Sequence, residues 1–170
     1  MTDHSNEPPP VLLCARVVEY AVLTSSVRYS GHSFLFFGDK EVGPVPRLAI
    51  CQKLDETTFT LFHCDDEWEV LGIAANYASI AEAKARAERI YPGVSECWVD
   101  PQVTEADAAS YIEQEFADDR CRFCGRLPPD FEKLVVHERG GSICNSCIDE
   151  LYAFIHEDPE SSSRPPEGSG

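Results

Sequence analysis

Four cysteines near the C-terminus restrict what this chain can fold into more than any other feature of its sequence. Cys121, Cys124, Cys144 and Cys147 form two C-x-x-C pairs that are separated by nineteen residues. Each pair has the spacing of a turn that directs two thiolates at one point, and two such turns complete a tetrahedral shell around Zn²⁺. Four protein ligands leave no position for water or substrate, so the sequence predicts one structural zinc ion per chain.

The residues around the two pairs predict a small treble-clef-like module, in the order knuckle, hairpin, knuckle, helix. Gly125 tolerates the positive φ that the first knuckle needs. Residues 134–137 have the composition of a short strand, residues 138–142 that of a turn, and Ile143 begins the return strand. After the second pair, apolar residues at helical spacing predict a helix, namely Ile148, Leu151, Tyr152 and Ile155.

Further residues of this segment carry a family resemblance. The cysteine spacing, Gly125, the Lys133-Leu134 pair before the hairpin and Ile143 before the second pair fit one pattern. With them, residues 119–156 resemble the N-terminal C4 zinc-binding domain of the ClpX unfoldase. The resemblance implies ligand roles for the four cysteines, dimerisation, and capture of client or adaptor proteins. ClpX also has an ATP-driven motor, whereas these 170 residues contain no G-x-x-x-x-G-K-[ST] phosphate loop, so we expect no ATP hydrolysis by that route.

The charge of the chain limits its partners. It has 14 basic and 30 acidic residues and a formal net charge of −16. Residues 1–118 hold eight basic and 20 acidic residues, and residues 119–170 hold six and ten, so neither part offers a basic patch. Such a field repels phosphate backbones, and we expect no nucleic-acid partner. The acidity is consistent with a basic protein partner, and simple solubility is the alternative explanation.

The beginning of the sequence bears on its location. Residues 1–10 show no basic, apolar pattern of a signal peptide. Residues 11–23 are apolar but too short to span a bilayer, and Arg16 and Glu19 interrupt them. Eight cysteines without an export signal fit a reducing compartment. We therefore expect a cytoplasmic protein with no membrane partner, and the resemblance to ClpX implies a bacterial one.

The remaining sequence predicts an α+β domain over residues 11–103, an antiparallel β-meander with one or two helices. The helices have clear start signals. Ser79 and Glu82 form a capping box before a helix over residues 81–90. Thr104 and Asp107 form a related cap before a second helix that ends near residue 116. A first strand is expected at residues 17–30, with helix as an alternative for its first half, and a short buried strand at 33–37 is closed by a turn at 38–40. Residues 47–54 and 58–64 are expected to form a hairpin about residues 55–57, and residues 67–74 add a third strand to it. Residues 94–99 are expected to form a strand at the edge of the sheet.

These elements give the expected domain organisation. The α+β domain is followed by a connecting helix and by the zinc module, between two disordered ends. The corresponding boundaries are 1–10 disordered, 11–103 α+β domain, 104–118 connecting helix, 119–158 zinc-binding domain and 159–170 disordered tail.

One cluster raises the question of catalysis. His63 and Cys64 stand side by side before the acidic residues 65–67. Because neighbours on a strand point to opposite faces, these two side chains are not expected to form a nucleophile–base pair. A histidine from elsewhere in the chain, such as His32, would have to supply the base. The simpler reading is a strand that runs into an acidic turn. The single cysteines are expected to be core thiols, with Cys51 roughly opposite Cys64 in the hairpin; they are Cys14, Cys51, Cys64 and Cys97.

The sequence therefore favours a non-enzymatic zinc-binding module for protein interaction that dimerises or binds client proteins, for example as an adaptor or regulator linked to Clp proteases. Its alternative is an acidic, immunity-like protein that neutralises a basic partner, and a thiol-dependent enzyme is a third hypothesis. Four apolar residues of the module are candidates for the contact surface and equally for the module's own core: Phe123, Leu127, Phe131 and Phe154.

Overall fold

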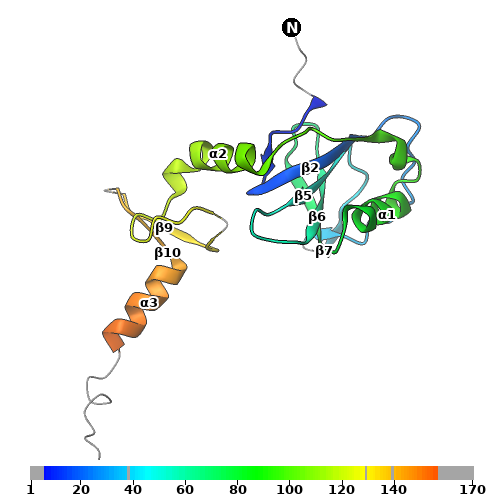
Figure 1. Cartoon of the computed structure of the whole chain (residues 1–170). Coiled ribbons are helices and arrows are strands. Elements are labelled where there is room, and N and C mark those ends of the chain that lie inside the picture. The colour runs from blue at the N-terminus through cyan, green and yellow to red at the C-terminus, as the bar shows by residue number, and fades with distance from the viewer. Residues whose placement is uncertain (1–5, 38, 129, 139, 157–170) are drawn as a thin grey trace, which may run out of the picture. The chain divides into compact units, whose positions relative to one another are not determined.

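An antiparallel sheet organises the first of the two units into which the chain divides, Met1–Glu115 and Phe116–Gly170 (Figure 1). The computed structural model describes residues 6–37, 39–128, 130–138 and 140–156. The strand order along the sheet is β1-β2-β5-β6-β7, and β8 also pairs with β2. These strands are β1 (Val11–Leu12), β2 (Ala15–Val22), β5 (Arg47–Gln52), β6 (Phe59–Cys64), β7 (Val70–Tyr77) and β8 (Trp98–Val99).

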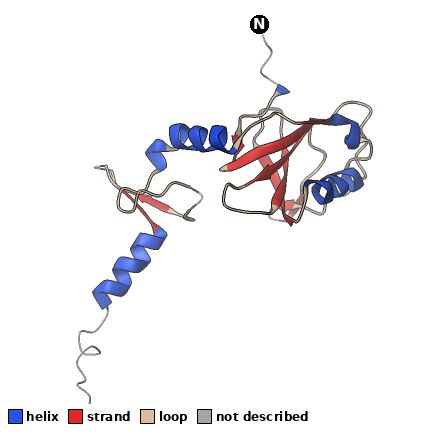
Figure 2. Ribbon diagram, in the orientation of Figure 1, coloured by secondary structure: helices blue, strands red, loops and turns tan. Residues whose placement is uncertain are grey.

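Helices and a small ribbon complete this unit. Helix α1 (Ile80–Ile90) contacts β6 and β7, and α2 (Glu105–Glu115) contacts β1 and β2. A 3₁₀ turn, η2 (Val94–Cys97), leads into β8. The strands β3 (Phe36–Phe37) and β4 (Lys40–Glu41) pair with each other in a separate ribbon. Figure 2 shows the resulting mixture of sheet and helix, which confirms the predicted α+β fold.

Both faces of the sheet are covered by other parts of the first unit, because successive side chains of β5 lie in two different cores. Leu48 and Ile50 join the core beneath α1, whereas Ala49 and Cys51 join a second core on the other face. All four side chains are fully buried. A strand that is buried on both faces reads as a continuous apolar run, which is what residues 48–51 show.

The hairpin of β5 and β6 has the predicted turn but not the predicted cysteine pairing. Cys51 pairs with Thr60, and Cys64 pairs with Arg47, so four residues of register separate the two cysteines. The hairpin turns between Asp55 and Glu56, and residues at equal distances from this point lie opposite each other. The expectation that Cys51 lies opposite Cys64 is wrong.

The segment at residues 33–37 is also not the buried strand that was predicted. Phe34 and Phe36 are each 66% exposed, and only Phe36–Phe37 are in a strand. The carboxylate of Glu41 accepts hydrogen bonds from the backbone N–H groups of Ser33 and Phe34, each at 2.7 Å, so these donors are not available to a ladder. The turn predicted at residues 38–40 includes residue 38, which lies outside the described residues.

Two further strands are shorter than predicted. Residues 15–22 form a strand, which confirms the predicted strand for residues 17–22 and makes the helical alternative wrong, but residues 23–30 are not in a strand. Residues 94–97 form a 3₁₀ turn, and only Trp98–Val99 pair at the edge. The carboxylate of Glu88 accepts hydrogen bonds from the N–H groups of Gly93 and Ser95, at 2.8 and 3.0 Å, and these bonds hold the chain in a turn.

The caps of α1 and α2 follow the predicted signals. The Ser79 hydroxyl accepts a hydrogen bond from the N–H of Glu82 at 3.2 Å, and the Glu82 carboxylate accepts one from the N–H of Ala78 at 2.8 Å. Thr104 and Asp107 bond to each other reciprocally at the start of α2. The helix predicted as a connector therefore spans Glu105–Glu115, within the first unit.

We expect Ser79→Ala to lower the free energy of unfolding of the first unit by about 1 kcal/mol, because one N–H at the start of α1 loses its acceptor. Urea unfolding followed by the fluorescence of Trp68 and Trp98, both in this unit, measures the change. Thr57→Ala, in the turn between β5 and β6, is a comparison that removes an exposed hydroxyl and leaves α1 and its cap intact. An unchanged midpoint for Ser79→Ala contradicts the role of the cap.

The second unit has the predicted order of elements. A 3₁₀ turn, η3 (Ala117–Asp119), precedes the first cysteine pair. The strands β9 (Leu134–Val136) and β10 (Ser142–Cys144) form an antiparallel hairpin, and α3 (Asn145–His156) follows at once (Figure 2). No helix in the described part of the chain is long and apolar enough to cross a membrane. Most of the two ends that were predicted to be disordered, 1–10 and 159–170, lies outside the described residues.

Candidate metal centre

The first cysteine pair lies in a tight turn. The N–H of Gly125 donates to the carbonyl of Cys121 at 2.8 Å, and the N–H of Cys121 donates to the carbonyl of Arg126 at 2.9 Å. Gly125 has a φ of +76°, in the left-handed region where a side chain would be strained. The glycine after Cys124 therefore allows the chain to reverse and brings both sulfurs to the same side of the turn.

The second pair lies at the junction of a strand and a helix. Cys144 is the last residue of β10, and Cys147 lies in the first turn of α3. Asn145 fixes this junction, because its side-chain oxygen accepts hydrogen bonds from the N–H groups of Glu132 and Lys133, at 3.2 and 3.1 Å. Its own N–H donates to the carbonyl of Lys133 at 3.0 Å. The hairpin thereby sets the position at which α3 begins.

The two pairs converge. All four sulfur atoms lie within 4.8 Å of one another, with 3.9 Å between Cys121 and Cys147 and 3.8 Å between Cys124 and Cys144. Zn–S bonds of about 2.3 Å in a tetrahedron place sulfurs about 3.8 Å apart. A disulfide would require about 2.05 Å. The donor set and its spacing therefore fit a tetrahedral metal ion, and four thiolates favour zinc among common metals.

The backbone also prepares these sulfurs to bind a cation. Burial raises the pKa of the Cys121 thiol, but hydrogen bonds from the backbone N–H groups of Cys124, Cys144 and Phe123 outweigh it and lower this pKa to about 6. The N–H of Cys144 reaches the Cys121 sulfur at 3.3 Å. Burial raises the pKa of Cys147, hydrogen bonds between its thiol and the neighbouring sulfurs raise it further, and repulsion by the ionised Cys121 sulfur makes the smallest contribution. A divalent cation removes that repulsion and allows all four thiols to ionise.

The cysteines are also the core of this unit. Cys121, Cys144 and Cys147 are the buried residues in the described part of residues 116–156. Three partly buried apolar side chains pack against them, those of Phe131, Leu134 and Ile143. So little apolar burial does not offset the entropy of ordering the chain, and a bound metal ion has to supply the difference.

The structure separates the four residues that were predicted as a contact surface or a core. Phe123 and Phe154 are 63% and 78% exposed. Phe131 packs against the buried cysteines, and Leu127 is half-buried. Phe131 therefore belongs to the small core, whereas Phe123 and Phe154 are available to a partner.

The His63–Cys64 cluster in the first unit has no geometry for thiol chemistry. His63 lies beside Tyr91, with its Nδ1 atom 3.4 Å from the tyrosine hydroxyl, whereas Cys64 lies in the core on the other face. Burial, followed by the charge of Asp65, raises the pKa of Cys64 to about 12, which keeps the thiol protonated. His32 has an exposed side chain and contacts Glu41.

The remaining cysteines do not form a second centre. Cys14, Cys51 and Cys64 are buried, and Cys97 is partly buried. Among the described residues, they form no second group of converging metal ligands. A feature that the sequence did not reveal is an apolar groove between residues 40–43 and the beginning of β7, because its two walls are distant in the sequence.

The chain has no match among family models, curated proteins or solved structures. The metal centre is therefore defined by its own geometry: four converging sulfurs on two turns that local hydrogen bonds hold in place.

Proposed function

We propose that this chain is a non-enzymatic binding protein whose second unit is a zinc-stabilised module for protein association. The four converging sulfurs support the zinc, and the surface of α3 supports the association. The resemblance of residues 119–156 to the ClpX zinc-binding domain points in the same direction, toward a dimer that binds client proteins in a Clp-linked adaptor or regulator.

The surface of α3 carries this proposal. Ile148, Tyr152 and Ile155 share one face of the helix at helical spacing and are 38%, 65% and 72% exposed. Phe154 adds a fourth apolar side chain nearby. An amphipathic helix normally buries such a stripe against a core, and no other part of the described second unit covers this one. A protein surface that covers the stripe would remove it from water.

A second copy of the module is the simplest occupant. In a twofold dimer each α3 contributes the same stripe, so each copy covers the other. A client protein with an exposed apolar segment would be the alternative occupant. Zinc is required in either case, because it holds α3 on the hairpin.

Native mass spectrometry of the full chain, with and without a zinc chelator, tests this proposal. We expect one zinc ion per chain and a dimer that dissociates when zinc is removed. Ile155→Ser should weaken the dimer at least about tenfold without loss of zinc, because it replaces the most exposed apolar side chain of the stripe with a polar one. Val136→Ser is the matched control: Val136 is a similarly exposed apolar residue, 67% against 72%, but lies on β9.

A zinc-bound monomer at all concentrations would contradict the dimer. If that monomer also fails to bind an unfolded client such as reduced, carboxymethylated α-lactalbumin, association through α3 is excluded. Zinc-free protein with a folded second unit would contradict the metal centre itself.

The net charge favours a second candidate function. An excess of 16 negative charges, together with a further −2 on a zinc tetrathiolate, steers the chain toward cationic proteins. An acidic, immunity-like protein that covers a basic partner would have this property. It would bind that partner as a zinc-bound monomer, so the oligomeric state separates the two functions.

The proposal that the protein is not an enzyme is supported by the first unit. Its one sequence candidate for a nucleophile, Cys64, is fully buried, and burial keeps its thiol protonated. A thiolate nucleophile needs the opposite environment, exposed and near a positive charge that lowers its pKa.

A further inference from the structure

Strand β7 ends the sheet of the first unit with an edge that is free to pair. It is the last strand in the order β1-β2-β5-β6-β7, and it pairs with β6 on its inner side (Figure 1). Strand β3 contacts β7 but belongs to a separate ribbon, so no strand among the described residues pairs with the outer edge. A free edge exposes unpaired N–H and C=O groups, which are a template for an added strand.

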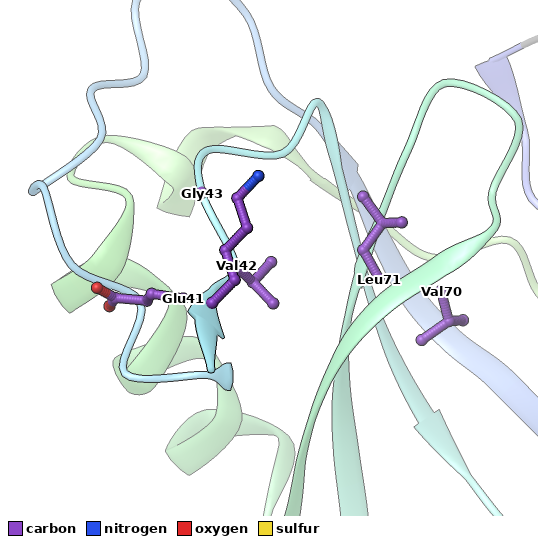
Figure 3. Close-up of a pocket in the computed structure, with 6 residues that line it drawn as sticks. Glu41, Val42, Gly43, Val70 and Leu71 are labelled. Atoms are coloured by element: carbon purple, nitrogen blue, oxygen red, sulfur yellow. The ribbon is translucent and has the colours of Figure 1, made fainter. Parts of the chain in front are cut away.

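An apolar groove runs along the beginning of this edge. One wall is formed by residues 40–43 and the other by Val70 and Leu71, and the groove has a volume of about 430 Å³. Figure 3 shows Val42 and Leu71 on facing sides of the groove, with the carboxylate of Glu41 directed away from it. The volume is within the usual range for pockets that bind ligands, about 300–1,000 Å³.

The apolar surface continues beyond the groove along β7. Leu71 and Ile73 are two residues apart on the strand and are 45% and 51% exposed. Phe36, on the ribbon that contacts β7, is 66% exposed. Exposed apolar side chains beside a free edge are unusual in a monomer, because they promote pairing with other chains. An added strand would cover these side chains with every second residue of its own.

The charge around the groove selects the partner. The lining of the groove contains one amine, that of Lys40, and one carboxylate, that of Glu41, and the chain segments that lead into its walls, residue 39 and residues 65–69, add five carboxylates. Glu41 is already engaged by Ser33, Phe34 and His32. Asp65 stabilises the β6–β7 turn by accepting hydrogen bonds from two backbone N–H groups. The other acidic residues of that turn form no ion pair within the described chain: Asp66, Glu67 and Glu69.

We propose that the free edge of β7 and the adjoining groove bind an extended, basic segment of a partner protein as an added β-strand. Main-chain hydrogen bonds to β7 hold the segment, apolar side chains at alternate positions enter the groove and cover Leu71 and Ile73, and lysine or arginine side chains face the acidic turn. This surface belongs to the first unit, so it functions independently of zinc and of α3. It adds a second binding surface to the proposed function.

Gly43 permits a specific block of the groove. A Cβ atom at Gly43 meets no atom within 4 Å, and the φ of this residue is outside the strained positive region. Gly43→Phe therefore adds a ring beside the groove without strain in the backbone, whereas Gly43→Ala adds too little to fill it. Gly72 is unsuitable for this purpose, because a Cβ atom there would lie 3.3 Å from Val42 and 3.4 Å from Leu35.

Fluorescence anisotropy with the full zinc-bound chain tests the proposal. The probe is a labelled peptide of eight residues, the length of β7, with alternating lysine and valine. The first comparison peptide has the same sequence with alternate backbone amides N-methylated, which retains the charge but removes ladder hydrogen bonds. The second alternates glutamate and valine. We expect the N-methylated peptide and the Gly43→Phe variant each to weaken binding at least about tenfold, a loss of about 1.4 kcal/mol, and Gly43→Ala to bind as the native chain does.

Leu71→Arg and Val99→Arg provide a second pair of variants. Both native residues are on edge strands and are 45% and 46% exposed, but only Leu71 lines the groove. We expect Leu71→Arg alone to weaken binding of the lysine peptide. Chelation of zinc should leave this binding unchanged, so a failure here is distinct from a failure of the α3 dimer.

Three results would overturn the proposal. Equal binding of the lysine peptide and its N-methylated form would show attraction by charge alone. Equal binding by the Gly43→Phe and native chains would place the peptide elsewhere. Dissociation of a native dimer by Leu71→Arg but not by Val99→Arg would identify the occupant of the edge as a second copy of this chain.

Discussion

Replacing Cys144 by serine is expected to unfold residues 121–156 and to leave the first unit folded. Cys144 is fully buried, and its sulfur lies 3.8 Å from that of Cys124 in the cluster. Loss of one of four thiolates removes much of the zinc affinity, and structural zinc contributes about 10–16 kcal/mol in comparable small domains. The described part of the second unit buries little besides its cysteines, so apolar packing does not compensate.

Two-dimensional ¹H–¹⁵N NMR measures this effect residue by residue. The amide signals of residues 121–156 should collapse to random-coil positions in Cys144→Ser and, reversibly, in the native chain after chelation. The signals of β2, β5 and β6 should keep their dispersion. Cys97→Ser is the control, because it removes a partly buried thiol of the first unit and leaves the zinc ligands intact.

Dispersed signals for residues 121–156 in the zinc-free chain would show that this unit folds without metal. That outcome would require a source of stability that its described residues do not display. Loss of dispersion in both units would instead show that folding of the first unit depends on the second.

The metal centre could be predicted because its determinants are local. Two C-x-x-C pairs and Gly125 specify where four sulfurs point, and the spacing of apolar residues after Cys147 specifies a helix. The caps at Ser79 and Thr104 are local in the same sense, since each cap and its partner lie three residues apart. Such local signals can be read from the sequence because they do not depend on how distant parts of the chain pack together.

The elements that differ from prediction depend on contacts between distant residues or on a competing acceptor. The carboxylate of Glu41 accepts hydrogen bonds from the backbone N–H groups of Ser33 and Phe34, eight and seven residues away, and thereby breaks the strand that the phenylalanines suggest. Glu88 does the same to Gly93 and Ser95. Propensity alone does not show where a carboxylate will find its donors.

The groove beside β7 illustrates the same limit at the level of function. Its walls, residues 40–43 and 70–71, are separated by the whole β5–β6 hairpin. Neither segment has a motif, and the sequence shows only apolar residues near acidic ones. The edge of the sheet becomes visible once the strand order is known.

The stability of the first unit is expected to fall as the pH is lowered from about 6.5 to about 4, and His63 is expected to cause about 3 kcal/mol of this loss. His63 is fully buried, and burial, assisted by the positive charge of Arg86, lowers its pKa from 6.5 to about 4. The folded state therefore holds this imidazole neutral. Below pH 6.5 the unfolded chain binds a proton that the folded chain does not bind until about pH 4, so protons favour unfolding across this window.

Urea unfolding at several pH values, followed by fluorescence of the chain's two tryptophans, measures the loss for the first unit alone. His63→Phe should reduce the steepness between pH 6.5 and 4, because the titrating group is gone. It also leaves the hydroxyl of Tyr91 without His63 as partner, although the N–H of Val45 still donates to that hydroxyl at 3.3 Å. The double variant His63→Phe with Tyr91→Phe removes the imidazole and the tyrosine hydroxyl together, and its stability should show the same reduced dependence on pH.

Leu61→Val separates titration from simple destabilisation. Leu61 is fully buried two residues before His63 on β6, and its truncation creates a small cavity with a cost of about 1 kcal/mol at every pH. We expect the free energy of unfolding of Leu61→Val to depend on pH as steeply as that of the native protein, and that of His63→Phe to depend on pH less steeply. If His63→Phe also runs parallel to the native protein, His63 does not couple folding to protons, and carboxylates alone account for the acid sensitivity of this unit.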